Sequence, residues 1–569
     1  MKVEMRSRSV NGAGDLTGTV AVFDDDGRFL WEDVVNLSKS RPREALISEV
    51  ADRTRVSRDR ARDAVLQLME DQRAAHLGVG EGAEAPKGER RADVLVKSFL
   101  GDGVELFHDQ SLEPHVAVPS GDRRAIYRLG SGMFRNQLAF HSYSVLGEVP
   151  SSETVRSSIN AMAGKAMFSS PMHRLHNRTA WDEGALYYDL GDWRAVRVTS
   201  AGWEVVVKPP ILFRRFPHQK PQVEPVQGDD LREILKFINI PDSDMQILFV
   251  TDIAAGNIPD IPVPVSLLHG PHGSAKSSAL RYKRELMDPA EVPLQAPPRD
   301  VAEFVQIASH NRNLFLDNLS SLPPWLSDGL SRFCTGDGFV KRRLYTDDDD
   351  VVYKPRGVGG ITGINLVVTA ADLLDRSFVY QLQPIPEQDR RSEREMDAEF
   401  EAIKPKLLGA MFDALAGAMT VKDGIQPPKL PRLADYALWG CAVAVAIGYT
   451  EDEYWAAIDA NSRTQTNEAL DASPVAQAVC ALMVDKESWT STPSELLTAL
   501  NTVAEREKID TTAKAWPKDA AWVTRRLNLV VPNLAQVGIT FTSKGEGNQR
   551  RITITSSGNA VYAVSGVSP

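Results

Sequence analysis

The sequence predicts an α/β fold built on a parallel sheet with helices on both faces, and three observations support this. An apolar run at 263–268 is typical of a buried strand. The glycine-rich loop that follows it leads directly into a predicted helix at 278–287. A second short apolar run, 314–317, ends in an acid. Strands that alternate with helices in this way favour a parallel sheet.

The loop after the first strand has the composition of a phosphate-binding loop. It is close to the pattern G-x-x-x-x-G-K-[ST], except that Ala275 replaces the second glycine and can disfavour a positive φ there. Backbone N–H groups would turn inward around a phosphate, aided by the helix N-terminus. Lys276 would reach the β- and γ-phosphates of ATP, and the Ser277 hydroxyl would hold Mg²⁺. The predicted nucleotide-binding residues are Gly270, Pro271, His272, Gly273, Ser274, Ala275, Lys276, Ser277 and Ser278.

Length and composition set limits on the class of protein. A chain of 569 residues predicts about three to five domains. Its net charge of −11 argues against a surface coated with nucleic acid but allows a local basic site. We find no apolar segment long enough to span a membrane, no signal region at the N-terminus, and three cysteines without zinc or disulfide spacing. These features predict a cytoplasmic protein with no membrane partner.

Hydrophobic periodicity and turn signals divide the chain into five segments. Within the second segment, a β-meander is expected at 185–208, and its aromatic residues would either stack on bases or fill a core. In the first, arginines on two amphipathic helices favour a solvated basic face over a helix-turn-helix. The segments are a small α/β unit at 1–75, an α+β accessory or collar region at 92–215, a motor at 228–400, a helical region at 401–470 and a C-terminal unit at 490–569.

The motor segment carries further candidate catalytic residues. Asp317 ends a strand 41 residues beyond Lys276 (317 − 276), which is typical of a Walker B acid that contacts magnesium. Asn318 follows it, where a second acid is common. Asn365 ends a later strand and would orient the attacking water. Arg376 leaves a helix and suits an arginine finger that reaches a neighbouring subunit. Between these lies a predicted hairpin at 339–353 with an acidic tip at 347–350 and three flanking cations, Lys341, Arg342 and Arg343, which would face DNA or solvent.

This order of motifs resembles AAA+ ATPases, most closely the superfamily-three helicase modules of phage and plasmid primase-helicases. The resemblance covers roughly 228–400 and implies a hexameric ring that translocates on DNA with ATP and Mg²⁺. It assigns Lys276 and Ser277 to Walker A, Asp317 to Walker B and Asn365 to sensor one. It also makes Arg376 the arginine finger. The paired acids and histidine of a primase are not apparent, so priming would come from a separate primase or polymerase.

The C-terminal segment resembles a winged helix. Helices are expected at 493–505 and 520–537, followed by two wing strands at 540–543 and 550–555. Basic residues on the second helix and the wing favour DNA binding, although winged helices also serve protein contacts. The candidate DNA-binding residues are Arg525, Arg526, Lys544, Arg550 and Arg551.

Taken together, the sequence predicts an ATP-dependent DNA helicase or translocase of phage, prophage or plasmid replication that acts as a ring. One alternative is an AAA+ ATPase that remodels or loads a protein partner. Another is a DNA-binding initiator or defence component in which the nucleotide acts as an assembly switch. Asn318 and the acidic hairpin tip favour the alternatives, while the C-terminal segment and the family resemblance favour the helicase.

Overall fold

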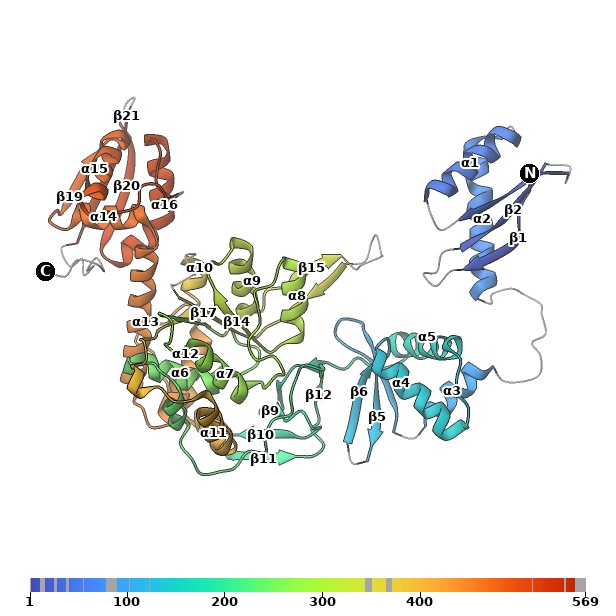
Figure 1. Ribbon diagram of the computed structural model, residues 1–569, viewed down its shortest axis with the longest axis horizontal. Helices are drawn as coiled ribbons and strands as arrows, with labels where there is room; N and C mark the ends of the chain where they lie inside the picture. Colours follow the sequence, from blue (N-terminus) through green and yellow to red (C-terminus); the bar gives the residue numbers. More distant parts are fainter. Residues whose placement is uncertain are drawn as a thin grey trace. The chain divides into compact units, whose positions relative to one another are not determined.

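The computed structural model describes the chain except for residues 1, 11–15, 25–27, 37–39, 55, 78–89, 102, 122, 343–349, 365–370, 514, 547–548 and 558–569. It divides into two compact units, Met1–Arg90 and Arg91–Pro569 (Figure 1). In the described part of the chain, no helix is long and apolar enough to cross a membrane. Residues 78–88, whose glycine, alanine and glutamate content predicts a linker, lie outside the described residues.

The first unit is a three-stranded antiparallel sheet covered by two helices. The strands β1 (Lys2–Val10), β2 (Leu16–Phe23) and β3 (Phe29–Asn36) pair in the order β1-β2-β3. Apolar side chains of β2, such as Val20 and Val22, pack against α1 (Ser40–Thr54) and α2 (Arg58–Leu77). The two helices and the sheet agree with the small α/β unit expected at 1–75.

The accessory region begins with a small α+β lobe. It consists of α3 (Arg91–Phe99), an antiparallel sheet β4-β5-β6, α4 (Gly132–His141), the π-helical turn Ser142–Leu146 and α5 (Ser152–Phe168). The three strands span Glu105–His108, Pro114–Ser120 and Arg123–Arg128. Phe99, Phe134 and Met162 join the three helices in one apolar core.

The predicted meander follows and is confirmed. Strands β8 (Thr179–Asp182), β9 (Ala185–Asp189), β10 (Ala195–Thr199) and β11 (Gly202–Val206) form one antiparallel sheet, beside the short parallel pair β7 (Leu175–His176) and β12 (Leu212–Phe213). Tyr188 is fully buried, and Trp203 packs against the same core. These aromatic side chains therefore fill a core.

The motor is a four-stranded parallel sheet in the order β14-β17-β13-β18. Its strands span Asn313–Leu319, Val358–Gly363, Val265–His269 and Ser377–Gln381 in that order. Alternate residues of β13 face opposite sides, so that Leu267 packs with α8 (Val301–His310) and α9 (Pro324–Thr335), whereas Leu268 packs with α6 (Ser243–Ala255) and α7 (Lys276–Met287). The parallel sheet with helices on both faces is as predicted.

Shorter elements complete the motor. A turn of 3₁₀ helix, Leu231–Phe237, precedes α6, and α10 (Ala371–Leu374) precedes β18. The predicted hairpin is present as β15 (Phe339–Arg342) and β16 (Asp350–Tyr353). Most of its acidic tip, 347–349, lies outside the described residues.

Helices dominate the rest of the chain. The long α11 (Glu393–Val421), α12 (Ala434–Ala446) and the first part of α13 (Glu451–Asp471) pack into the large core shared with α6 and α7. A separate core joins α14 (Pro474–Met483), α15 (Pro493–Arg506) and α16 (Ala520–Gln536) with a sheet in the order β19-β21-β20. The strands of this sheet span Ser488–Ser491, Gln549–Ser556 and Ile539–Glu546.

Candidate active site

The glycine-rich loop lies between β13 and α7, at the carboxyl edge of the parallel sheet. A β-carbon on Gly270, whose φ is +148°, would stand 2.2 Å from the carbonyl oxygen of Leu382, so only glycine fits there. The Gly270 N–H donates to the Ile364 carbonyl at 3.1 Å. β17 and β18 flank β13 on opposite sides, so the strand order reverses at β13. In parallel sheets, ligands bind outside the carboxyl ends of the strands at such a reversal.

Ala275 adopts the left-handed conformation that the missing glycine would favour. Its φ is 61° and its ψ 29°, and α7 begins at the next residue. The strain expected from the sequence is therefore present, at roughly 1–2 kcal/mol for a non-glycine residue.

The Lys276 ammonium group turns back onto its own loop. Its Nζ donates to the carbonyl oxygens of Gly270 at 2.7 Å and Pro271 at 2.8 Å, and to Ser274 Oγ at 3.1 Å. Among the residues that the structure describes, no carboxylate oxygen lies within ion-pair distance of this nitrogen. Burial lowers the pKa of Lys276, and the nearby Asp317 opposes that shift. The loop thus holds a cation without a matching anion.

Ser277 and Asp317 meet, although 40 residues separate them. The Ser277 hydroxyl donates to Asp317 Oδ1 at 2.7 Å, and the Thr362 hydroxyl from β17 donates to the same oxygen. One hydroxyl and one half-buried carboxylate are oxygen ligands of the kind that Mg²⁺ prefers. Nothing in the sequence pattern selects Thr362, apart from its being a hydroxyl within a buried apolar strand.

The backbone conformation at position 318 explains why an asparagine is found there. Its φ is 55°, at an irregularity in the pairing of β14 with β17, and its N–H donates to Thr362 Oγ1 at 2.8 Å. Asparagine is one of the few residues with a side chain that adopt this conformation readily. The exposed side chain lies beside Asp317, where a second acid was expected.

A cavity of 540 Å³ opens over the loop and is lined by residues that sequence reasoning missed. Arg390 and Arg391, which follow β18, share it with His272, Gly273 and Ala275. Asn239 fixes the base of the loop, because its amide donates to the carbonyls of Ser274 at 3.2 Å and Gln383 at 2.7 Å. No spacing rule relates these residues to the loop, so only the fold brings them together.

Arg376 lies at the opposite edge of the sheet. It directly precedes β18, which runs parallel to β13, so it stands at the amino edge, away from Lys276. Its guanidinium pairs with Asp372 and donates to the Asp372 carbonyl oxygen at 2.7 Å. Asn365 lies outside the described residues.

The predicted nucleic-acid residues fall into two groups. In the C-terminal unit, Arg525 and Arg526 of α16 lie over the ring of Trp522. Lys544 pairs in register with Arg551, and Gly545 with Arg550, across β20 and β21. In the motor, Lys341 and Arg342 belong to β15, while Arg343 lies outside the described residues.

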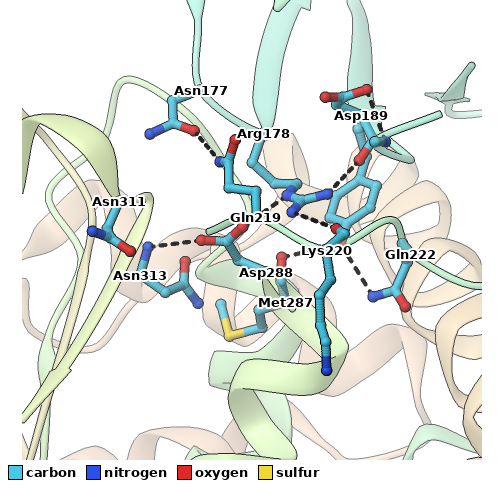
Figure 2. Close-up of polar contacts among 12 residues, drawn as sticks. Asn177, Arg178, Asp189, Gln219, Lys220, Gln222, Met287, Asp288, Asn311 and Asn313 are labelled. Carbon is cyan, nitrogen blue, oxygen red and sulfur yellow. Dashed lines mark hydrogen bonds and ion pairs between the residues drawn. The ribbon is translucent and has the colours of Figure 1, made fainter. Parts of the chain in front are cut away.

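The far end of α7 is locked by buried ion pairs. Asp288, at the end of the helix, pairs with Arg178 at 2.8 Å (Figure 2). It also pairs with Arg284, at 3.3 Å. Burial alone would raise the pKa of Asp288, but the two guanidinium groups hold that pKa below its usual range. One turn earlier, Lys283 pairs with Asp252 of α6, and both side chains are fully buried. These contacts fix the helix that presents Lys276.

Two family models match parts of the chain. Residues 231–462 match the family model of actinomycete integrative conjugative element replication proteins, and residues 475–565 match the C-terminal domain of the RepA protein of these elements. Both regions are similar to a DNA replication protein. No curated protein matches the sequence.

The solved structures to which the chain is similar are distant from it. The apo structure of the NrS-1 C-terminal region is 13% identical, with 81% of this chain and 99% of that chain covered and a TM-score of 0.38. The SCCmec type IV Cch structure, titled an active helicase, is 9% identical, with 79% and 92% covered and a TM-score of 0.40. Likenesses this remote do not specify an activity.

Proposed function

We propose that this protein is an ATP-driven DNA helicase or translocase in the replication of a mobile genetic element, working as a ring. The observation that carries the proposal is the contact between Ser277 and Asp317 beside Lys276. A lysine, a hydroxyl and an acid at a glycine loop are the set that phosphoryl transfer from a nucleotide requires. Similarity of 231–462 to a replication protein supports DNA as the substrate.

The residues fit ATP and Mg²⁺. Lys276 would exchange its carbonyl partners for phosphate oxygens, which is favourable because a charged pair is stronger than an ammonium–carbonyl contact. Ser277 and Asp317 would hold the metal, which when bound would neutralise charge that develops on the phosphates. Arg390 and Arg391 line the same cavity and would add positive charge on its open side.

Arg376 would act on the nucleotide of a neighbouring subunit. Its place at the amino edge keeps it from the Lys276 of its own chain, which supports a role between subunits. In that role it would leave Asp372 for a phosphate, and Asn365 would orient the attacking water. Hydrolysis would then require at least two neighbouring subunits, as in a ring.

The test of this proposal is ATP hydrolysis with and without single-stranded DNA, beside a Lys276→Ala control. Strong stimulation by DNA that is lost in the control supports a motor on DNA. Hydrolysis that is indifferent to DNA would instead favour a protein-remodelling ATPase.

The arginine finger is tested by mixing subunits. Arg376→Ala and Lys276→Ala chains, each inactive alone, should regain part of the activity when mixed, since one contributes the loop and the other the arginine. Normal hydrolysis by Arg376→Ala alone, with no recovery on mixing, would rule out the finger.

One observation favours a second function, a nucleotide-dependent assembly switch. Asn318 stands where a second acid would polarise water, and its backbone conformation explains an asparagine without catalysis. ATP binding without hydrolysis would support the switch.

A further inference from the structure

A large cavity lies at the amino edge of the motor sheet, on the opposite side from the nucleotide loop. Its volume is 790 Å³, within the range of ligand sites. Gln110, Arg174, His176 and Asn177 of the accessory region form one wall. The other wall comes from the motor, where residues just before β14 and β17 line it.

The charges around this cavity are unbalanced. Among the residues that the structure describes, its lining contains a single carboxylate, that of Asp260, which lies 3.8 Å from the Arg174 guanidinium. Arg214 is also paired, with Asp109 behind it. The cationic residues of the lining are Arg174, Arg214, Arg312, Lys354 and Arg356. The wall therefore carries a clear excess of positive charge.

Arg312 is the most informative of these cations. It is 95% buried, and its guanidinium donates to the carbonyl oxygens of Gly256 at 2.9 Å and Ile258 at 3.0 Å. In the described part of the chain it makes no ion pair, and its Nε is buried without a hydrogen-bond partner. Burial lowers the pKa of Arg312 to about 10, so the group stays charged at neutral pH. Asp288 and Asp260 act on this guanidinium only from beyond ion-pair distance. A buried cation without a directly paired carboxylate is costly unless an anion completes the site.

Neutral hydrogen-bonding groups accompany the cations. Thr179 lines the cavity, and its buried hydroxyl has no partner among the described residues. Arg356 is fixed by two hydrogen bonds to the Thr335 carbonyl, at 3.1 and 2.9 Å. Lys354 directly follows β16 and is exposed. Fixed guanidinium groups and hydroxyls of this kind suit phosphate oxygens.

We propose that this cavity binds the phosphate backbone of single-stranded DNA between the accessory region and the motor. Positive grooves that follow a backbone are typical of single-strand binding, and a recess of this size admits one strand more readily than a duplex. The inference goes beyond the proposed ATPase, since it concerns DNA contact in the absence of nucleotide. It adds a contact apart from both basic groups predicted from the sequence.

The test uses a matched pair of charge-reversed full-length proteins, Arg174→Glu/Lys354→Glu and Arg135→Glu/Lys165→Glu. All four side chains are exposed, and the second pair lies on α4 and α5 outside the cavity. Binding of a fluorescent oligothymidylate, without nucleotide, is measured by anisotropy over about 50–200 mM salt. The cavity variant should bind the oligonucleotide at least about tenfold more weakly. The slope of log binding constant against log salt concentration should also fall in magnitude by about 1.4, because each of the two lost phosphate contacts removes roughly 0.7.

The control variant should stay within about twofold of the unmodified protein, with both melting temperatures unchanged. Equal affinities and salt slopes for the two variants would overturn the proposal. Binding of tripolyphosphate, measured as a second probe, distinguishes a site for a DNA strand from a site for a free phosphate anion. Loss of tripolyphosphate binding with intact oligonucleotide binding would also overturn it. Should the double variant fold poorly, Lys354→Gln alone should reduce the salt slope by about 0.7. A Lys276→Ala protein that fails to hydrolyse ATP yet binds the oligonucleotide normally would show that DNA binding at this cavity is independent of ATP hydrolysis.

Discussion

The two lysines of α7, Lys276 and Lys283, lie in opposite electrostatic environments. Lys276, at the first turn, is held by carbonyl and hydroxyl oxygens of the loop. Lys283, two turns later, is fully buried, pairs with Asp252 and donates to Ser266 Oγ at 2.7 Å. The Tyr436 hydroxyl donates to the other oxygen of Asp252 at 2.5 Å. Lys283, whose charge is neutralised by Asp252, stabilises the fold. Lys276 contacts only neutral oxygens, so its charge is available to an anionic ligand.

The largest effects should come from the same substitution at both ends. Lys283→Met leaves Asp252 as an uncompensated buried charge and should reduce the free energy of unfolding by about 3–5 kcal/mol. Lys276→Met should change it by less than about 1 kcal/mol, because only net contributions of hydrogen bonds are lost. Urea denaturation followed by tryptophan fluorescence gives both values, and nucleotide binding by Lys276→Met should be lost. Equal destabilisation by the two variants would contradict this contrast.

A smaller effect should come from pH at the strand that enters the loop. Burial, with a contribution from Lys276, lowers the pKa of His269 to about 4, against an ordinary value of 6.5. The unfolded chain therefore binds the proton more readily, so the stability contribution is complete above pH 6.5 and falls as the pH drops toward 4. Between pH 7 and pH 5 the loss should be about 2 kcal/mol.

His269→Gln should remove that part of the pH dependence, measured as the urea midpoint at pH 7 and pH 5. His272→Gln, at an exposed position three residues later, is the matched control and should keep the original dependence. An unchanged dependence in His269→Gln would show that other groups cause it.

A change in rate should follow from restoring the missing acid. Asn318→Asp keeps the shape of the side chain, and aspartate also tolerates the observed positive φ. A carboxylate able to polarise water should raise steady-state ATP hydrolysis by about tenfold or more. Asn318→Ala, which adds no acid, should not. An unaltered rate in Asn318→Asp would mean that water is polarised by another group.

The smallest effect should be at the loop itself. Ala275→Gly relieves the left-handed conformation at 61°, although glycine increases the freedom of the unfolded chain. The net stabilisation should be about 1 kcal/mol or less, seen as a small rise in melting temperature. Ala279→Gly, inside the same helix, should have the opposite sign. A fall in stability for Ala275→Gly would show that the loop is unstrained.

Local patterns account for what could be predicted from the sequence. The strand, loop and helix around Lys276 are consecutive, so periodicity and glycine placement predicted them together. Contacts between distant residues could not be predicted in this way: Arg178 and Asp288 are 110 residues apart, and Lys283 and Asp252 are 31 apart. Arg390 reaches the loop only because β18 lies next to β13. Thr362 and the basic cavity were missed for the same reason.

Strands β14 and β17 have different neighbours at their two ends. They begin just after Arg312 and Arg356 and carry Asp317 and Thr362 near their other ends. From Arg312 to Asp317 is five residues (317 − 312), or about 16 Å of extended chain. Such strands bear load along their axis with little stretch, and a shift of 1 Å would spoil a 2.7 Å contact such as that between Ser277 and Asp317. A force applied at the amino edge of this sheet would therefore displace Asp317 relative to Ser277 at the carboxyl edge.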